Sequence, residues 1–125
     1  MDNSSIDQHQ TNMESAEKIG LINCQETYRC KITVLKKEFA QELYEQYPYG
    51  GPHACGRLEV GQVFYTNIRW DPPEGFCAWA WGDIRAVIMS IHGGHPSPMI
   101  CCCTDGLRPV TFKVERVAVE SVPHD

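Results

Sequence analysis

Met99-Ile-Cys-Cys-Cys-Thr-Asp-Gly-Leu-Arg-Pro-Val-Thr-Phe-Lys-Val-Glu-Arg-Val117 contains two strand-like segments joined by Asp105-Gly106. Asp-Gly between two such segments is a strong signal for a β-hairpin with a two-residue turn. A turn of this kind pairs Cys103 with Arg108 and Cys101 with Val110, whereas Pro109 requires an edge position or a wider loop. The hairpin is then expected to present one face made of Cys101, Cys103, Arg108, Val110, Phe112 and Val114.

The segments before this hairpin predict the rest of a small α+β domain. Tyr28–Lys37 alternates apolar and polar residues, which is typical of a half-buried strand. Residues 38–47 suit a short helix, residues 61–66 a second strand, and residues 76–91 the main helix. The order β-α-β-α-β-β favours a mostly antiparallel sheet with the helices packed on one of its faces.

The main helix is expected to be buried on several sides. Its first half, Phe76-Cys-Ala-Trp-Ala-Trp81, is almost entirely apolar, and His92-Gly-Gly94 is a plausible stop. Helical spacing places Trp79 and Asp83 on a second stripe. The first stripe is expected to contain Cys77, Trp81, Ile84, Ile88 and His92.

The two ends of the chain are expected to lie outside this domain. Residues 1–26 are rich in Ser, Asn, Gln and Glu and lack aromatic residues, which predicts a largely disordered extension with a short helix around Met13–Ile19. We therefore divide the 125 residues into this extension, a single domain at 27–119 and a tail at 120–125.

The charge distribution argues against nucleic-acid and membrane-surface partners. The net charge of −5 comes mostly from residues 1–26, which hold five acidic residues and one basic residue, so the body is nearly neutral. A nucleic-acid binder or a polybasic membrane protein would instead show a basic face. No apolar run approaches the roughly 20 residues of a membrane span. The N-terminus also lacks the pattern of a secretory signal, so we expect a cytoplasmic protein.

The cysteines do not suggest a disulfide framework. Their number is odd, and three are consecutive. Adjacent cysteines on a strand point to opposite faces, so they do not readily form a disulfide with each other. Reduced thiols in a reducing compartment fit this pattern better, and many of them would serve as small buried hydrophobic residues. The seven are Cys24, Cys30, Cys55, Cys77, Cys101, Cys102 and Cys103.

Three stretches resemble a family of short microbial proteins of uncharacterised function. They are Lys31-Ile-Thr-Val-Leu-Lys36, Glu74-Gly-Phe-Cys-Ala-Trp-Ala-Trp81 and Cys102-Cys-Thr-Asp-Gly-Leu-Arg-Pro-Val110. The family pattern also has a cysteine after Gly-Pro, which Cys55 after Gly51-Pro52 resembles. This chain departs from the pattern in that spacing and in the additional Cys101. The resemblance implies a shared fold and a shared site, but no reaction.

Two kinds of cysteine chemistry are open. Thiols and imidazoles are ligands for zinc or another soft-ligand metal, although no Cys-x-x-Cys pair is present and no cofactor is otherwise predicted. A reactive thiol needs a nearby cation or a helix N-terminus, which Cys77 and Cys103 would have. The candidate metal ligands are Cys77, His92, His95, Cys102 and Cys103.

The leading hypothesis is a small enzyme or ligand-binding protein with an apolar pocket for a small molecule. We expect non-redox chemistry on a small apolar molecule, such as isomerisation, cyclisation or elimination, with Asp83 as acid or base, Cys77 and Cys103 as polar or nucleophilic groups and Arg108 as anion holder. A metal-binding module and an interaction domain with structural cysteines are the alternatives, and the oligomeric state is open. The expected pocket walls are Trp79, Trp81, Phe76 and Tyr65.

Deleting residues 1–26 is expected to leave the melting temperature nearly unchanged. The segment has too few apolar residues to offset the entropy lost when a chain becomes ordered. Thermal unfolding of the full chain and of the shortened chain tests this expectation. A large fall in melting temperature would show that the segment packs on the domain.

Overall fold

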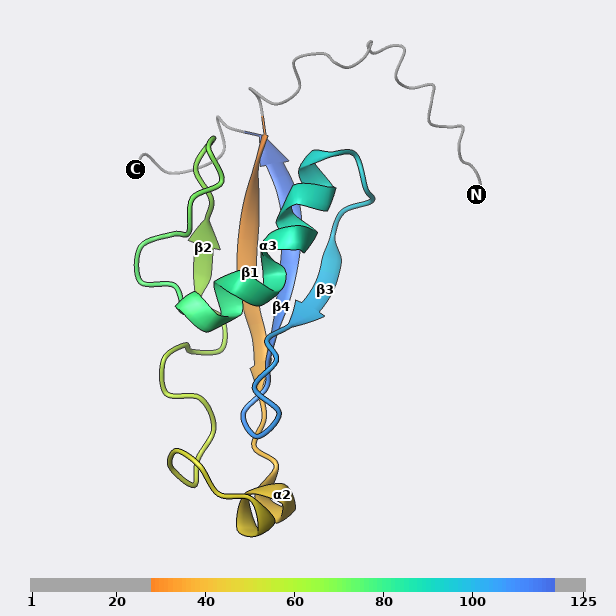
Figure 1. Cartoon of the computed structure of the whole chain (residues 1–125). Helices are drawn as coiled ribbons and strands as arrows, with labels where there is room; N and C mark the ends of the chain where they lie inside the picture. The colour runs from red at the N-terminus through yellow and green to blue at the C-terminus, as the bar shows by residue number, and fades with distance from the viewer. Residues whose placement is uncertain (1–27, 119–125) are drawn as a thin grey trace.

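The computed structural model describes residues 28–118 and contains one four-stranded antiparallel sheet (Figure 1). Its strands are β1 (Tyr28–Lys37), β2 (Val63–Tyr65), β3 (Met99–Cys102) and β4 (Val110–Ala118), in the spatial order β2-β1-β4-β3. This arrangement confirms the predicted α+β class. The expected N-terminal extension, its short helix and the C-terminal tail lie outside the described residues.

The two long strands, β1 and β4, form the centre of the sheet. They pair from Tyr28 opposite Ala118 to Lys37 opposite Val110, with an irregularity between Val34 and Lys36. Over residues 30–34 of β1 and 110–114 of β4, every second residue points to one face and is buried, as the alternation in the sequence predicts. The buried residues are Cys30, Ile32, Val34, Val110, Phe112 and Val114.

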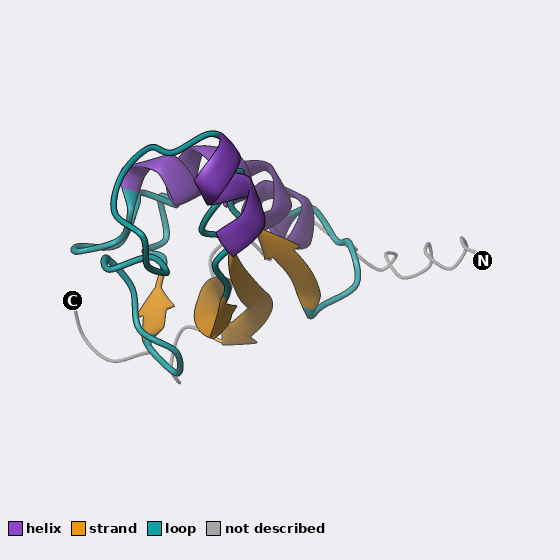
Figure 2. Ribbon diagram, turned by 90° about the horizontal axis from the view of Figure 1, so that it is seen from below, coloured by secondary structure: helices purple, strands orange, loops and turns teal. Residues whose placement is uncertain are grey.

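The helix α3 (Ala78–His92) covers this apolar face, and Figure 2 shows the helices on the same side of the sheet. Its buried stripe differs slightly from the predicted one, because Ala80 takes a core position and Trp81 is only half-buried at the margin. Phe76, just before α3, packs edge-to-face on Trp81 with ring centroids 6.1 Å apart. The buried residues of α3 are Ala80, Ile84, Ile88 and Ile91.

The short helix α2 (Gln41–Gln46) buries none of its residues and lies beyond the end of β1 (Figure 1). Two backbone hydrogen bonds hold the segment that leads from β1 to α2. Glu38 N–H donates to the Pro109 carbonyl at 3.0 Å, and Ala40 N–H donates to the Leu107 carbonyl at 2.9 Å. The chain leaving β1 is therefore attached to the chain entering β4. No helix in the described part of the chain is long and apolar enough to cross a membrane.

The predicted two-residue turn between β3 and β4 is wrong. Cys101 pairs with Phe112 instead of Val110, and residues 103–109 form a wider connection. Pro109 cannot donate a ladder hydrogen bond, and the Asp105 carboxylate accepts the N–H groups of Leu107 and Arg108, which stabilises the wider loop. Because the register differs by two residues, each side chain keeps its predicted face.

Replacing Cys30 with Val is expected to reduce the loss of stability at alkaline pH. Burial raises the pKa of the Cys30 thiol from 9.0 to about 11, although the positive charge of Arg116 opposes the shift. The folded state then keeps a proton that the unfolded chain has released. The stabilising contribution is therefore complete below pH 9 and is lost as the pH rises towards 11, by about 2 kcal/mol.

Urea unfolding under reducing conditions at about pH 8 and pH 10.5 measures this difference. The Cys30→Val variant is expected to lose less stability than the wild type between the two pH values. Cys102→Ser, which removes an exposed thiol, is the matched control and should follow the wild type. Equal alkaline losses in Cys30→Val and wild type would contradict the assignment.

Candidate functional site

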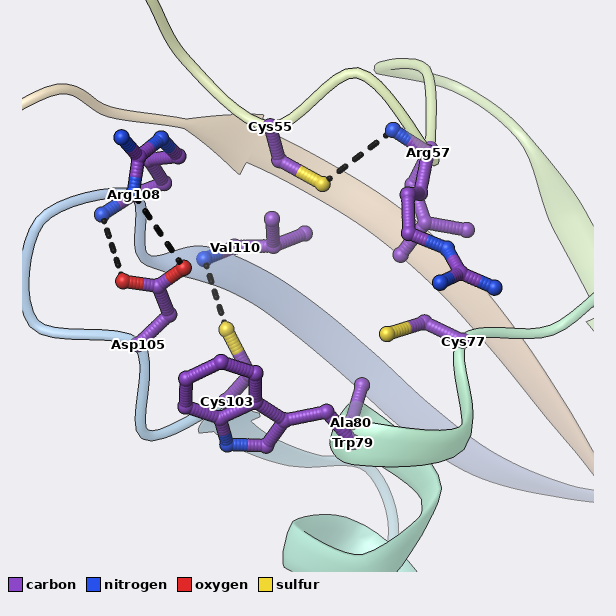
Figure 3. Close-up of a pocket in the computed structure, with 10 residues that line it drawn as sticks. Cys55, Arg57, Cys77, Trp79, Ala80, Cys103, Asp105, Arg108 and Val110 are labelled. Carbon is purple, nitrogen blue, oxygen red and sulfur yellow. Dashed lines mark hydrogen bonds and ion pairs between the residues drawn. The ribbon is translucent and has the colours of Figure 1, made fainter. Parts of the chain in front are cut away.

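A small pocket lies where three separate segments meet, between the start of α3, the connection from β3 to β4 and the loop before β2 (Figure 3). Its volume is about 80 Å³, well below the roughly 300–1,000 Å³ of sites that enclose a drug-sized ligand. The pocket can therefore take a group of a few atoms or one end of a longer molecule. Its lining consists of Cys55, Arg57, Leu58, Cys77, Trp79, Ala80, Cys103, Asp105, Arg108 and Val110.

Three thiols point into the pocket, one from each of the three segments (Figure 3). Cys55 Sγ accepts a hydrogen bond from Arg57 N–H, and Cys103 Sγ accepts one from Val110 N–H, both at 3.4 Å. The three thiols therefore share one cavity in which two of them already contact polar donors.

Cys77 is the N-cap residue of α3, and its side chain makes no capping hydrogen bond. The thiol is therefore directed into the pocket instead of onto the helix backbone (Figure 3). The N-terminal end of a helix carries a partial positive charge, which favours an anionic group beside it. Cys77 thus has the local feature that the sequence predicts for a reactive thiol.

Cys30 and Cys101 do not line the pocket, and burial raises the pKa of each thiol. Cys30 is completely buried, and burial raises its pKa to about 11. Burial, together with the neighbouring Cys102, also raises the pKa of Cys101 to about 11. Both side chains are therefore held as protonated thiols at neutral pH. Cys30 packs in the core as a small apolar group, and the partly buried Cys101 packs against the core.

Arg108 lines the pocket, but its guanidinium is already bound by the protein. It donates hydrogen bonds to the carbonyls of Tyr49, Gly51 and His53, the last at 3.1 Å, and it lies 3.8 Å from the Asp105 carboxylate. The Tyr49 ring also lies under the cation, with 5.1 Å from the guanidinium carbon to the ring centroid. Arg108 therefore holds the loop against the start of β4 instead of presenting a free anion site as the sequence predicts.

Asp105 and Tyr49 reinforce this arrangement. The Tyr49 hydroxyl donates to Asp105 at 2.6 Å, and this hydrogen bond raises the pKa of Tyr49. Burial alone would raise the pKa of Asp105, but hydrogen bonds from Tyr49 and from the N–H groups of Leu107 and Arg108 outweigh it, so the pKa is lowered. Gly50 is required beside them, since its φ is +68° and a Cβ would lie 2.7 Å from Arg108 Nη2.

Asp83, expected to act as acid or base, is not among the lining residues. Its carboxylate accepts hydrogen bonds from the Thr104 N–H at 2.7 Å and from the Thr104 hydroxyl. The same hydroxyl accepts the indole N–H of Trp79 at 2.7 Å. Asp83 therefore attaches α3 to the connection after β3, and it fixes Trp79 as a wall of the pocket.

The other expected walls lie elsewhere. Phe76 is buried in the core against Phe64, and Trp81 packs on its ring. Tyr65 pairs with Lys31, so it lies on the face of the sheet away from α3. Cys55 and Arg57 were not among the predicted site residues, although the resemblance singled out Cys55 after Gly51-Pro52; no signal in the sequence indicated Arg57.

The candidate metal ligands do not assemble around one point. Cys77 and His92 lie at opposite ends of α3, roughly 22 Å apart at the helical rise per residue. His92 stacks on Trp70 with ring centroids 4.5 Å apart, and Cys102 is exposed. Among residues 28–118, no group of three or more His, Cys, Asp or Glu side chains is placed to hold a metal ion.

Comparisons of the chain with protein-family models, with curated proteins and with solved structures give no match.

Replacing Arg108 with Lys is expected to destabilise the protein by about 2–4 kcal/mol. An ammonium cannot bond three carbonyls, pair with Asp105 and lie flat on an aromatic ring at the same time. Urea unfolding of the variant measures the loss. Arg85→Lys, at an exposed position on α3, is the control and should change stability by less than about 0.5 kcal/mol. Equal stability of the two variants would contradict the role given to Arg108.

Proposed function

We propose that the protein binds a small molecule at the cysteine-lined pocket and acts on it through a thiol. The observation that supports this proposal is the convergence of Cys55, Cys77 and Cys103 from three distant segments on one small cavity. Cysteines that serve only as packing residues are not expected to line the same cavity from three separate segments. Trp79 and Leu58 supply an apolar surface for the part of the ligand that enters.

The thiols are the groups in the lining that are best placed for bond chemistry. Asp105 and Arg108 bind each other and the loop, and the guanidinium of Arg57 is not an acid or base at neutral pH. We assign the attack to Cys77 because it lies at the N-terminus of α3 and makes no capping bond. Cys55 and Cys103, across the pocket, are the candidates to donate or receive a proton (Figure 3).

A thiolate supports non-redox isomerisation or elimination without a cofactor. It adds to the electrophilic carbon of a polarised double bond, so that a carbon–sulfur bond forms and the π electrons move toward the electron-withdrawing group. The remaining carbon–carbon single bond can then rotate. When the carbon–sulfur bond breaks, its electrons return to the thiolate, the double bond forms again, and the isomerised product leaves without net oxidation or reduction.

Native alkylation followed by mass spectrometry tests the proposal. At neutral pH, iodoacetamide is expected to label Cys77 faster than the buried Cys30 and the partly buried Cys101, whose pKa values are raised by burial. Cys102 is exposed and serves as the solvent-accessible reference within the same molecule. Labelling of Cys77 at or above the rate of Cys102, despite its partial burial, supports an activated thiol.

Two outcomes would contradict the proposal. Uniformly slow labelling of the pocket cysteines until the protein is unfolded would leave them as packing residues of an interaction domain. Labelling that becomes fast only after a chelator is added would indicate a bound metal and favour the metal-binding alternative. The Cys77→Ser variant, compared with Cys102→Ser, shows whether the fast label belongs to the pocket.

A further inference from the structure

We propose that the ligand of this pocket carries a carboxylate, and that Arg57 is the residue that selects it. The inference rests on the proposed function and adds the substrate class: a short molecule with an electrophilic carbon inside the pocket and an anionic group at its mouth. It depends on the charges of the lining residues and on how the loop that carries Arg57 is held.

Arg57 supplies a cation at the edge of the pocket, and its side chain is exposed. Its backbone N–H donates to Cys55 Sγ, and its side chain extends from the loop toward Cys77 (Figure 3). Among residues 28–118, no hydrogen bond or ion pair engages its guanidinium. Arg108, the other arginine of the lining, instead has its guanidinium bound to three carbonyls and to Asp105.

The pocket has no free negative charge to balance Arg57. Asp105 is the acidic residue of the lining, and it already accepts hydrogen bonds from Tyr49 and pairs with Arg108. The neighbouring Glu59 lies 3.6 Å from Lys37. The positive end of α3 is directed to the same cavity through Cys77. An anionic ligand is therefore favoured over a neutral or cationic one.

The backbone on both sides of Arg57 is anchored, so its exposed side chain starts from a defined position at the edge of the pocket. Lys37 Nζ donates to the carbonyls of Cys55 and Leu58, each at 2.8 Å, and Leu58 is buried. Arg57 lies between these two fixed residues. A guanidinium at the end of this side chain matches the planar geometry of a carboxylate and can bind both of its oxygens.

The size of the pocket limits the rest of the ligand. About 80 Å³ accommodates only a few carbon atoms, and most of the inner surface is made of apolar or sulfur-bearing side chains. A short α,β-unsaturated carboxylic acid has the required parts. When its negative charge is paired with Arg57, the carboxylate withdraws electrons from the double bond, and its β-carbon is the position that a thiolate attacks. Binding by Arg57 would hold that carbon near Cys77.

Iodoacetate and iodoacetamide test the inference because they differ in charge but react in the same way. In both, the thiolate forms a bond to the methylene carbon and iodide leaves. In the wild type, the rate ratio of iodoacetate to iodoacetamide is expected to be higher at Cys77 than at the exposed Cys102. Arg57→Gln should lower this ratio at Cys77 about fivefold, and added salt should lower it in the wild type as well.

Three further measurements make the result specific. Arg85→Gln removes an exposed arginine of α3 that does not line the pocket, so it should leave the ratio unchanged. Arg57→Lys keeps the charge and should retain most of the preference. Labelling of the buried Cys30 reports on folding, since a misfolded variant would expose it.

The failure of this inference differs from the failure of the proposed function. Fast labelling of Cys77 by iodoacetamide, with a ratio that Arg57→Gln does not change, would overturn the carboxylate assignment and leave the reactive thiol in place. Slow labelling of Cys77 by both reagents would overturn the proposed function and this inference with it.

Discussion

The site depends on the hydrogen bonds that the buried guanidinium of Arg108 donates to the loop before β2. A charge with so little exposure needs partners, and the carbonyls of Tyr49, Gly51 and His53 supply them. These carbonyls belong to a loop with no regular secondary structure, more than fifty residues away in the sequence. Binding them fixes the path of the chain that next delivers Cys55 to the pocket.

Two other contacts complete the walls of the pocket independently. Asp83 binds Thr104 and thereby joins α3 to the connection after β3, while Lys37 binds two carbonyls of the loop before β2. Each of the three segments is thus attached to the sheet or to its neighbour by charged hydrogen bonds, which are stronger than neutral ones. Because all three are anchored, their thiols meet at a defined place, as a site that performs chemistry requires.

The sequence predicts those parts of this structure that depend on local periodicity. The alternation in Tyr28–Lys37 indicates the strand β1 with its observed bounds, and the apolar spacing after Phe76 indicates α3. The two-residue turn that Asp-Gly predicts is wrong because this signal is local, whereas the wider loop that Pro109 indicated as the alternative is present. The hydrogen bonds from the N–H groups of Leu107 and Arg108 to the Asp105 carboxylate stabilise the wider loop, and the Asp-Gly pair alone does not predict them.

The candidate site was only partly predictable for the same reason. Cys77 was predicted from a helix start, which is a local feature, and Cys103 from an expected pairing with Arg108 that the structure does not contain. Arg57 lies in a stretch without periodicity, and only the anchoring of its loop by Lys37 and Arg108 brings it to the pocket. Asp83 was expected to be an acid or base because the sequence shows its position on α3 but not its partner, Thr104.

The three consecutive cysteines show how one local pattern gives three environments. Alternation along β3 turns Cys101 toward the core and leaves Cys102 exposed on the other face. Cys103 directly follows β3, and it lines the pocket. Burial raises the pKa of Cys101, so it stays a thiol, whereas Cys103 accepts an N–H hydrogen bond beside two other sulfurs. The end of β3 is therefore the point at which the cysteines of this chain change from packing residues to candidates for chemistry.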